Sequence, residues 1–411
     1  VMSYYQIRCF HSGKKLVSLV SRHISSTRLV RSYNASTVLQ TLYKHGSCSR
    51  SQLAKLTGMS PATITRIVAE LMEQGIVLEG RAGKSTGGRK PIYLHIDHSK
   101  LYIASLKLLR DDCCAALLDL KGSILHTEHL AWNAQPEVLL NDAVKILSAM
   151  FEKEQVNREH IIGVGVAVSG ICHPGEGRVI RSVNLGWEDV PIASILGAQL
   201  ELPVFIENDA NACALAELWL GAAKDAANSM YIKTEEGAGA GIISNKALLS
   251  GSRFMTGEIG HIPVIPQGEP CRCGQQGCLE PYVYFRDVQA RYGRISGKRV
   301  DRGQFIELVH SRDEQALRLV RETASALALA CAHWGILLDL DVITIGGFWG
   351  TFKQDIVEHC QNYYIAILRQ SGIPCSTTIT GSDFSEDADL LGAAGLVIDR
   401  WFDPLSVPFN R

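Results

Sequence analysis

Two similar series of predicted strands and helices constrain the fold of this chain more than any other feature. The first series has three extended runs, a long helix and a buried strand: Leu101–Leu108, Cys113–Leu120, Ile124–His129, Pro136–Lys153 and Ile161–Val168. The second has two strands and, beyond a long insert, a helix and a strand: Met230–Lys233, Ala240–Ser244, Glu314–Leu337 and Val342–Gly347. Because mixed sheets bind ligands beyond their strand ends, this order predicts a two-lobed α/β protein with a ligand cleft between the lobes.

Charge is divided unevenly along the chain. The 411 residues are 46% hydrophobic and 20% charged, and they include no uncharged apolar run of about 18 residues, so disordered, collagen-like and membrane-spanning classes are excluded. Residues 1–95 contain fourteen Lys and Arg against three acidic residues, a net charge of +11, whereas the other 316 residues carry −12. The sequence therefore predicts a basic module fused to an acidic body.

The basic module has the pattern of a winged helix-turn-helix. Three helices are expected, and the third begins at Ser60 and Pro61, which are typical residues for a helix N-cap and first position. Apolar residues from Ile64 to Met72 recur at helical spacing, so one face of this helix is core. The opposite face carries small and polar residues, as expected of a helix that reads base edges and phosphates.

A glycine-rich wing follows the three helices. Residues 80–90 contain four glycines and four cations between two short strands, a composition that favours phosphate or minor-groove contact. The alternative is a solvated helical hairpin with a basic loop. The residues expected to contact double-stranded DNA are Arg50, Ser60, Ala62, Thr63, Thr65, Arg66, Lys84, Ser85, Thr86, Arg89 and Lys90.

Most of the twelve cysteines are scattered singly or lie in apolar context, which fits reduced thiols in a cytoplasmic protein. Residues 1–30 have no acidic residue and are rich in Ser and Arg, so a targeting peptide is an alternative to a flexible basic arm. We favour the arm, because a nucleic-acid-binding module follows it. No membrane insertion is expected.

One imidazole and three thiols have the spacing of a metal site. His261, Cys271, Cys273 and Cys278 form the pattern H-x9-C-x-C-x4-C, a donor set that suits tetrahedral Zn²⁺. Four protein ligands close the coordination sphere, so the expected ion is structural, one per chain. The alternative is three reduced loop cysteines. The second ring nitrogen of His261 can face a cleft while the first binds the metal.

Residues around this motif carry a family resemblance. The segments Gly257–His261 and Gly268–Glu280, together with the Ser85–Arg89 wing, resemble the signature of the ROK family of bacterial repressors, open reading frames and sugar kinases. Within that family the chain is similar to the repressors of glucose and N-acetylglucosamine metabolism. The resemblance implies a winged helix-turn-helix followed by a two-lobed, actin-like or sugar-kinase-like ATPase fold, an α/β class.

The resemblance also implies a sugar pocket. It places a kinase's general base at Asp209 and sugar contacts at Asn184, Asn208, Asp209, Glu258, His261 and Glu280. Carboxylates and amides bond the hydroxyls of a pyranose in a way that hydrocarbon side chains cannot. The alternative for Asn208 and Asp209 is a plain helix N-cap.

The phosphate-binding loops of a kinase are altered in this sequence. Where the family's kinases have Asp-x-Gly-Gly-Thr, the strand Ala104–Arg110 has neither the Asp nor the glycine pair. In the second loop, Glu235 and Glu236 place carboxylates beside the position of a polyphosphate. We therefore expect no catalytic residue, and interpret Asp209 as a vestigial base that binds sugar.

These observations predict a sugar-responsive DNA-binding repressor of carbohydrate uptake or metabolism genes. The expected domains are the arm 1–30, the winged helix 31–95, a first lobe 96–220 to which a C-terminal helix 388–411 returns, and a second lobe 221–387 with a zinc-binding insert 257–281. The expected partners are operator DNA, a sugar or sugar phosphate, and a second copy in a homodimer or dimer of dimers. An active ATP-dependent sugar kinase with a regulatory DNA-binding domain, and a repressor sequestered by a sugar-transporter protein, are the alternatives.

Overall fold

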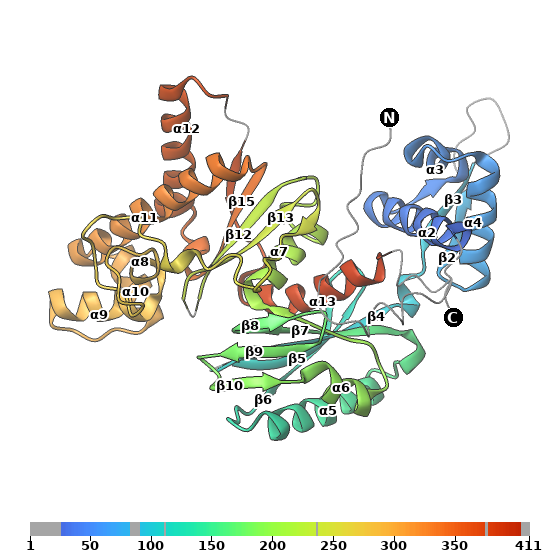
Figure 1. The fold of residues 1–411 in the computed structure, drawn as a ribbon, viewed down its shortest axis with the longest axis horizontal. Coiled ribbons are helices and arrows are strands. Elements are labelled where there is room, and N and C mark those ends of the chain that lie inside the picture. Colours follow the sequence, from blue (N-terminus) through green and yellow to red (C-terminus); the bar gives the residue numbers. More distant parts are fainter. Residues whose placement is uncertain (1–25, 83–90, 111, 236, 375–376, 404–411) are drawn as a thin grey trace. The chain divides into compact units, whose positions relative to one another are not determined.

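The chain divides into two compact units. The computed structural model describes residues 26–82, 91–110, 112–235, 237–374 and 377–403 (Figure 1). One unit contains residues 1–97 and 400–411, and the other contains residues 98–399. Among the described residues, no helix combines the length and the apolar character that a membrane span requires.

Within residues 26–82 and 91–97, the smaller unit has three helices and a three-stranded antiparallel sheet in the order β1-β3-β2. Its elements are α2 (Ser26–His45), β1 (Cys48–Ser49), α3 (Arg50–Thr57), α4 (Pro61–Glu73), β2 (Val77–Ala82) and β3 (Ile92–Ile96). Of the predicted arm, residues 1–25 lie outside the described residues, and the last five begin α2.

Local sequence signals explain the helix boundaries in this unit. Ser49 caps α3 through a capping box with Gln52, and Gly58 ends α3 in the left-handed region at φ 71°, which glycine adopts without strain. The Ser60 hydroxyl accepts the backbone N–H of Thr63, and Pro61 is the first residue of α4. The predicted start of the third helix is therefore confirmed.

The first lobe of the larger unit is a five-stranded sheet in the order β11-β7-β4-β5-β6. Its strands are β4 (Tyr102–Leu109), β5 (Asp112–Asp119), β6 (Ile124–Leu130), β7 (Ile161–Val168) and β11 (Val204–Asn208). Helices α5 (Pro136–Lys153) and α6 (Ile192–Leu200) pack on one face. A small antiparallel sheet that the sequence did not predict joins this core: β8 (Ile171–His173), β9 (Arg178–Ser182) and β10 (Trp187–Val190).

The second lobe has a five-stranded sheet in the order β14-β13-β12-β15-β16. Its strands are β12 (Ser229–Thr234), β13 (Gly239–Ser244), β14 (Ala247–Leu248), β15 (Val342–Gly347) and β16 (Thr378–Gly381). The helices of this lobe are α8 (Glu280–Val283), α9 (Phe285–Ser296), α10 (Arg302–His310), α11 (Glu314–Leu338) and α12 (His359–Ser371). A π-helical segment, Lys353–Glu358, leads into α12.

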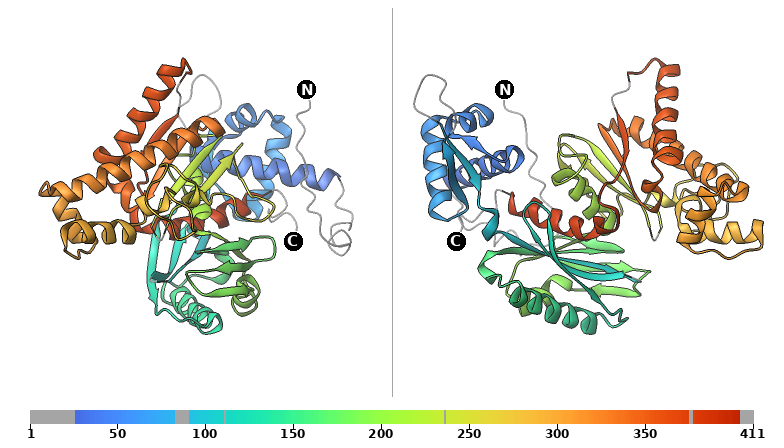
Figure 2. Two further views of the ribbon diagram at one scale, coloured as in Figure 1. Left: turned by 60° about the vertical axis from the view of Figure 1, so that its left-hand side comes forward. Right: turned by 180° about the vertical axis from the view of Figure 1, so that it is seen from behind.

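Helix α7 (Asp209–Trp219) and helix α13 (Ala388–Trp401), except for its last two residues, belong to the larger unit (Figure 2). A Cβ on Gly165 of β7 would lie 1.9 Å from the carbonyl oxygen of Ala393, so α13 can approach this strand because residue 165 is glycine. The predicted C-terminal helix ends at Trp401 rather than at residue 411, because the next two described residues form a turn and a bend. Residues 404–411 lie outside the described part of the chain.

Candidate functional site

A cavity of about 540 Å³ in the larger unit brings together polar side chains from both lobes. Ser169, Arg181 and Asn208 come from the first lobe, and Lys233, Thr256 and Arg272 come from the second. All six residues that the sequence indicated for sugar binding line it: Asn184, Asn208, Asp209, Glu258, His261 and Glu280. The fold thus brings these six residues to one cavity, and a cavity of this volume accommodates a small ligand.

The turn from β11 into α7 places Asn208 and Asp209 at the cavity. The Asn208 side-chain oxygen accepts the backbone N–H of Ala210 at 3.0 Å, and its Nδ2 donates to the carbonyl oxygen of Gly170 at 3.1 Å. Buried Glu207 accepts the N–H of Asn208 at 2.8 Å. Asn208 is thus an N-cap, as the alternative reading expected, and it also lines the cavity.

Asp209 belongs to a buried group of three charges. The Lys233 ammonium donates to Asp209 Oδ2 at 2.8 Å and also to Asp389 Oδ1. Side-chain exposure is 6% for Lys233, 13% for Asp209 and 8% for Asp389. Burial opposes the charged form of Lys233, but the two carboxylates hold the pKa of its ammonium well above the ordinary value. Burial raises the pKa of Asp389, against the opposing effect of Lys233.

Two further contacts organise the cavity wall. Asn184 Nδ2 donates to the Ser169 hydroxyl at 3.1 Å. Arg272 Nε donates to Glu280 Oε1 at 3.0 Å, and the guanidinium lies 4.8 Å from the centre of the Tyr284 ring. Desolvation raises the pKa of Glu258, although the nearby His261 lowers it in part. A carboxyl with a raised pKa can donate as well as accept a hydrogen bond.

Sequence reasoning missed Lys233 and Arg272 as cavity residues. A lysine at the inner end of the apolar strand Met230–Lys233 was a signal, because buried lysines need a partner. The partner Asp389 lies 156 residues along the chain, so spacing in the sequence could not identify it. Arg272 was missed because it lies between Cys271 and Cys273, two residues considered only as metal ligands.

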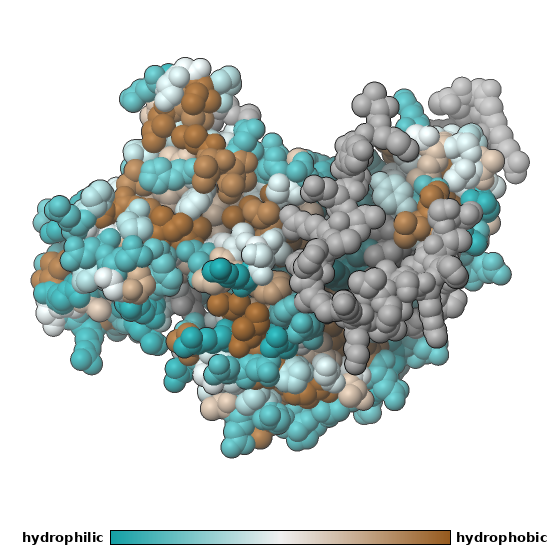
Figure 3. Space-filling model, in the orientation of Figure 1, coloured by the Kyte–Doolittle hydropathy of each residue, from teal (hydrophilic) through white to brown (hydrophobic). Residues whose placement is uncertain are grey.

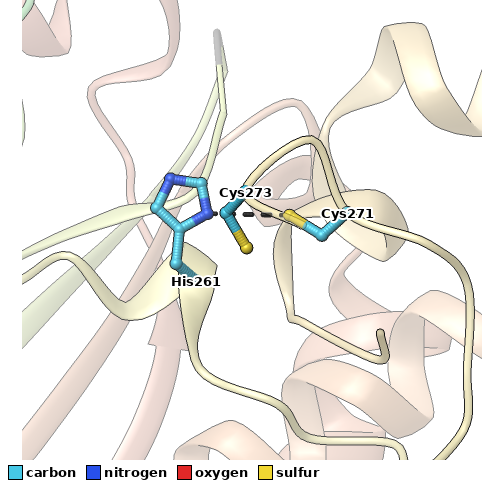
Figure 4. Close-up of side chains that lie close together, drawn as sticks. All are labelled: His261, Cys271 and Cys273. Carbon is cyan, nitrogen blue, oxygen red and sulfur yellow. Dashed lines mark hydrogen bonds between the residues drawn. The ribbon is translucent and has the colours of Figure 1, made fainter. Parts of the chain in front are cut away.

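The predicted metal ligands also lie together (Figure 4). One donor atom each from His261, Cys271 and Cys273 lie within 4.8 Å of one another. His261 Nδ1 is 3.6 Å from Cys271 Sγ, and its other ring nitrogen points away from both cysteines. Cys278 Sγ is 3.7 Å from Cys273 Sγ. Metal–ligand distances of about 2.0–2.3 Å place tetrahedral ligand atoms roughly 3.3–3.8 Å apart, so the His261–Cys271 and Cys273–Cys278 separations are compatible with a shared ion, while the group within 4.8 Å consists of His261, Cys271 and Cys273.

The thiols in this cluster do not ionise alike. The backbone N–H of Gln275 lowers the pKa of Cys273, whereas burial and the neighbouring thiols raise the pKa of Cys278 to about 12. Gly277 adopts φ 75°, and a Cβ there would lie 1.7 Å from the carbonyl oxygen of Ile265, so the turn before Cys278 requires glycine. A divalent cation would favour the thiolate at every sulfur.

In the smaller unit, α4 separates an apolar face from an exposed polar face. Four side chains of α4 are fully buried: Ile64, Ile67, Val68 and Leu71. Ala62, Thr65 and Arg66 are exposed, and Thr63 is half-buried beside the Ser60 hydroxyl at 2.9 Å. The Arg66 guanidinium has no hydrogen bond or ion pair with another described residue. This face therefore presents donors and a free cation, as a recognition helix requires.

The other predicted DNA contacts differ in what the structure shows. Arg50 forms an ion pair with Glu79 at 3.0 Å and approaches Met72, so its guanidinium is held within the module. The wing residues Lys84, Ser85, Thr86, Arg89 and Lys90 lie outside the described residues.

Comparison with known proteins decides the family. The model of the ROK family matches residues 104–400, and that of a winged helix-turn-helix DNA-binding domain matches residues 33–77. The chain belongs to the ROK family. The resemblance seen in the sequence is confirmed, and so is the predicted fold class, a winged helix-turn-helix followed by the sugar-kinase-like α/β fold of ROK proteins.

ROK relatives match over most of the chain. A xylose repressor of Caldicellulosiruptor bescii is 29% identical over 92% of this chain and 98% of its own. The transcriptional regulator NagC of Escherichia coli strain K12 is 31% identical over 65% of this chain and 66% of its own. A solved ROK family transcriptional regulator, described as a homologue of the Escherichia coli MLC protein, has a TM-score of 0.80 at 23% identity, covering 92% of this chain and 98% of that one.

In the two segments that were compared with kinase phosphate loops in the sequence, the structure shows ion pairs that the sequence did not predict. Buried Lys107 of β4 forms an ion pair with Asp112 of β5, and Leu109 pairs with Asp112 across a short turn. Arg302 forms an ion pair with Glu235 at 3.1 Å, so the charge of this carboxylate is compensated within the protein. Glu236 lies outside the described residues.

Proposed function

We propose that this chain is a sugar-responsive, DNA-binding transcriptional repressor of genes for carbohydrate uptake or metabolism. The observation that carries the proposal is a winged helix-turn-helix in the same chain as a cavity lined by Asn184, Asn208, Asp209, Glu258, His261 and Glu280. The names of two relatives, a xylose repressor and the N-acetylglucosamine repressor of Escherichia coli O6:H1, support a sugar or sugar phosphate as the effector.

We propose that the chain is not a kinase. A general base must have a free lone pair aimed at the hydroxyl that it deprotonates. The Lys233 ammonium is bonded to Oδ2 of Asp209, which leaves Oδ1 for a hydroxyl, so the proposal rests on the strand Ala104–Arg110, where the Asp and the glycine pair of the kinases' phosphate loop are absent. ATP consumption at ordinary kinase rates with any of a panel of hexoses would support the kinase alternative.

We propose that His261, Cys271, Cys273 and Cys278 hold one structural Zn²⁺. When bound, the ion would fix the loop that carries Arg272 and positions Glu280 at the cavity. The chain's own residues would bind the sugar, because four protein ligands leave no open coordination position.

Self-association of two chains is part of the proposal, since a winged-helix repressor reads paired half-sites. Apolar atoms gather over α11 and α12 on the face shown in Figure 3. Ile336 and Leu337 of α11 are 45% and 69% exposed, and Ile373 just after α12 is 48% exposed. These side chains support a contact with a second copy. Sequestration by a sugar-transporter protein is the alternative mode of control, and a pull-down with and without sugar tests it.

The exposed face of α4 gives the first prediction. The DNA probe is a duplex that the wild-type protein enriches from a random pool. Arg66→Ala should lower the affinity for this duplex by about tenfold or more, the size expected for the loss of one specific base contact. Because Arg66 is exposed, the melting temperature should stay unchanged. Fluorescence anisotropy measures the affinity. Arg318→Ala, an exposed arginine of α11, is the control, and equal effects of the two variants would remove Arg66 from the interface.

The cavity gives the second prediction. A sugar that binds the folded protein raises its melting temperature by mass action, so a thermal-shift screen of monosaccharides and their phosphates should find at least one active compound. Asp209→Asn should lose most of that shift, since an amide replaces one acceptor oxygen with a donor. Asp189→Asn, an exposed aspartate 71% accessible at its side chain, should keep the full shift. A full shift in Asp209→Asn would exclude Asp209 from the sugar site.

A further inference from the structure

Two buried charged residues of the larger unit, Lys233 at the cavity wall and Asp389 behind it, are not among the residues proposed above to contact the sugar or DNA. Each lies almost entirely out of solvent. Taking charges out of water is costly, and a buried ion pair often adds no net stability over apolar residues of similar size. Stability alone therefore does not account for this pair.

Lys233 connects the cavity to helix α13. Its ammonium lies between Asp209 Oδ2, which is at the cavity, and Asp389 Oδ1, in the first turn of α13. Asp209 is the first residue of α7, so one lysine bonds to an aspartate side chain in the first turn of each of two helices, α7 and α13. A ligand hydroxyl that donates to Asp209 competes with Lys233 for the same carboxylate.

Helices α7 and α13 also pack backbone to backbone. A Cβ on Gly392 would lie 2.8 Å from the backbone carbon of Ala212, and one on Gly395 would lie 2.9 Å from the backbone nitrogen of Ala216. Trp219 Nε1 donates to Asp399 at 3.3 Å near the other end of α7. Backbones packed this closely leave no room for one segment of α13 to shift alone, so we expect a small displacement at one end of α13 to move the whole helix.

The far end of α13 belongs to the smaller unit. Its last two residues and Phe402 fall within that unit, where Phe402 is 1% exposed. The Ser36 hydroxyl of α2 donates to the carbonyl oxygen of Phe402, and the Tyr43 ring meets the Phe402 ring edge-on with centroids 5.2 Å apart. Helix α2 is part of the same small core as the DNA-reading helix α4.

We propose that Lys233 and Asp389 transmit occupancy of the sugar cavity to the DNA-binding unit through α13. A hydroxyl that bonds to Asp209 weakens the hold of Asp209 on Lys233, and the ammonium then bonds more strongly to Asp389 at the start of α13. Asp389 is a positioning residue, because it acts through Lys233 and does not line the cavity. This inference rests on the proposed function, since it supplies the differential contact that a sugar-dependent change of state requires.

The test is Asp389→Asn, which removes one charge and leaves the Lys233–Asp209 pair in place. Asp383→Asn, which removes one charge from the exposed ion pair with Lys353, is the matched control. The probes are D-xylose, D-glucose, N-acetylglucosamine and their phosphates, with the enriched duplex as DNA. In the wild type, the active sugar should weaken DNA binding by about tenfold, whereas Asp389→Asn should respond by less than about threefold while still binding the sugar. The control should respond like the wild type.

The outcomes separate this inference from the proposed function. If none of these sugars changes the DNA affinity of the wild-type protein, the proposed function is overturned, and the inference with it. A responsive wild type together with an equally responsive Asp389→Asn would overturn the inference alone. Reciprocity offers a second readout: sugar affinity should differ with and without DNA in the wild type but not in the variant. If Asp389→Asn does not fold, hydrogen exchange of the wild type decides, and unchanged protection of α13 on adding sugar would overturn the inference.

Discussion

Replacing Lys233 with methionine is expected to lower the free energy of unfolding by about 3–5 kcal/mol, the cost of removing one partner from a buried ion pair. The substitution leaves Asp209 and Asp389 buried near each other without the ammonium that bonds to both. Methionine is close to lysine in length, so the loss reports charge rather than a cavity. Urea unfolding followed by circular dichroism measures the change.

The matched control is Lys353→Met. Lys353 forms an ion pair with Asp383 at 3.2 Å, but the two side chains are 53% and 91% exposed. Exposed pairs contribute less than about 1 kcal/mol, because water and salt screen them. Equal losses in the two variants would contradict the claim that Lys233 neutralises a buried pair of carboxylates.

Replacing Cys271 with serine is expected to remove about one equivalent of zinc per chain and to destabilise the loop around residues 257–281. A serine hydroxyl is a poor ligand for Zn²⁺ at neutral pH, and the remaining thiols would be left crowded without a cation. Elemental analysis of protein purified without chelators gives the stoichiometry. Limited proteolysis reports the order of the loop.

Cys172→Ser controls for the loss of a buried thiol elsewhere. Cys172 is 2% exposed and lies in β8 of the first lobe, so this variant should retain its zinc. Full zinc content in Cys271→Ser would remove this residue from the ligand set. A wild-type protein purified without zinc, and unable to take it up, would contradict the metal assignment altogether.

Local patterns made much of the fold predictable. The start of α4 at Ser60 and Pro61 follows from capping chemistry, and β7 and β15 have the predicted bounds because their buried apolar runs end at small residues. The small β8–β10 sheet was missed because its strands are three to five residues long and lack a clear alternation. Short strands are decided by the tertiary surroundings more than by their own sequence.

The candidate site was predictable to the extent that a motif marks it. Asn208 and Asp209 follow a strand, and Glu258, His261 and Glu280 flank the cysteine motif, so the family resemblance could place them. Lys233 with Asp389, and Arg302 with Glu235, are pairs formed by residues far apart in the sequence. The second pair changes the electrostatic argument, because a carboxylate already neutralised by arginine repels a phosphate less than a free one.

The charge division along the chain now has a structural counterpart. The exposed Arg66 of α4 lies in the basic unit, whereas Arg31 and Arg50 are paired with Glu70 and Glu79. Of the basic residues counted in the sequence, Arg31 and Arg50 are therefore compensated within the protein. The salt dependence of DNA binding should be correspondingly smaller than the net charge of +11 suggests.

The central claim is that one chain binds both a sugar and DNA, and that the first controls the second. Fluorescence anisotropy of the enriched duplex, titrated with protein in the presence and absence of the sugar that most raises the melting temperature, tests it most directly. We predict that the sugar weakens DNA binding by about tenfold and that Asp209→Asn abolishes this response. Equal DNA affinity with and without every sugar that binds would contradict the account.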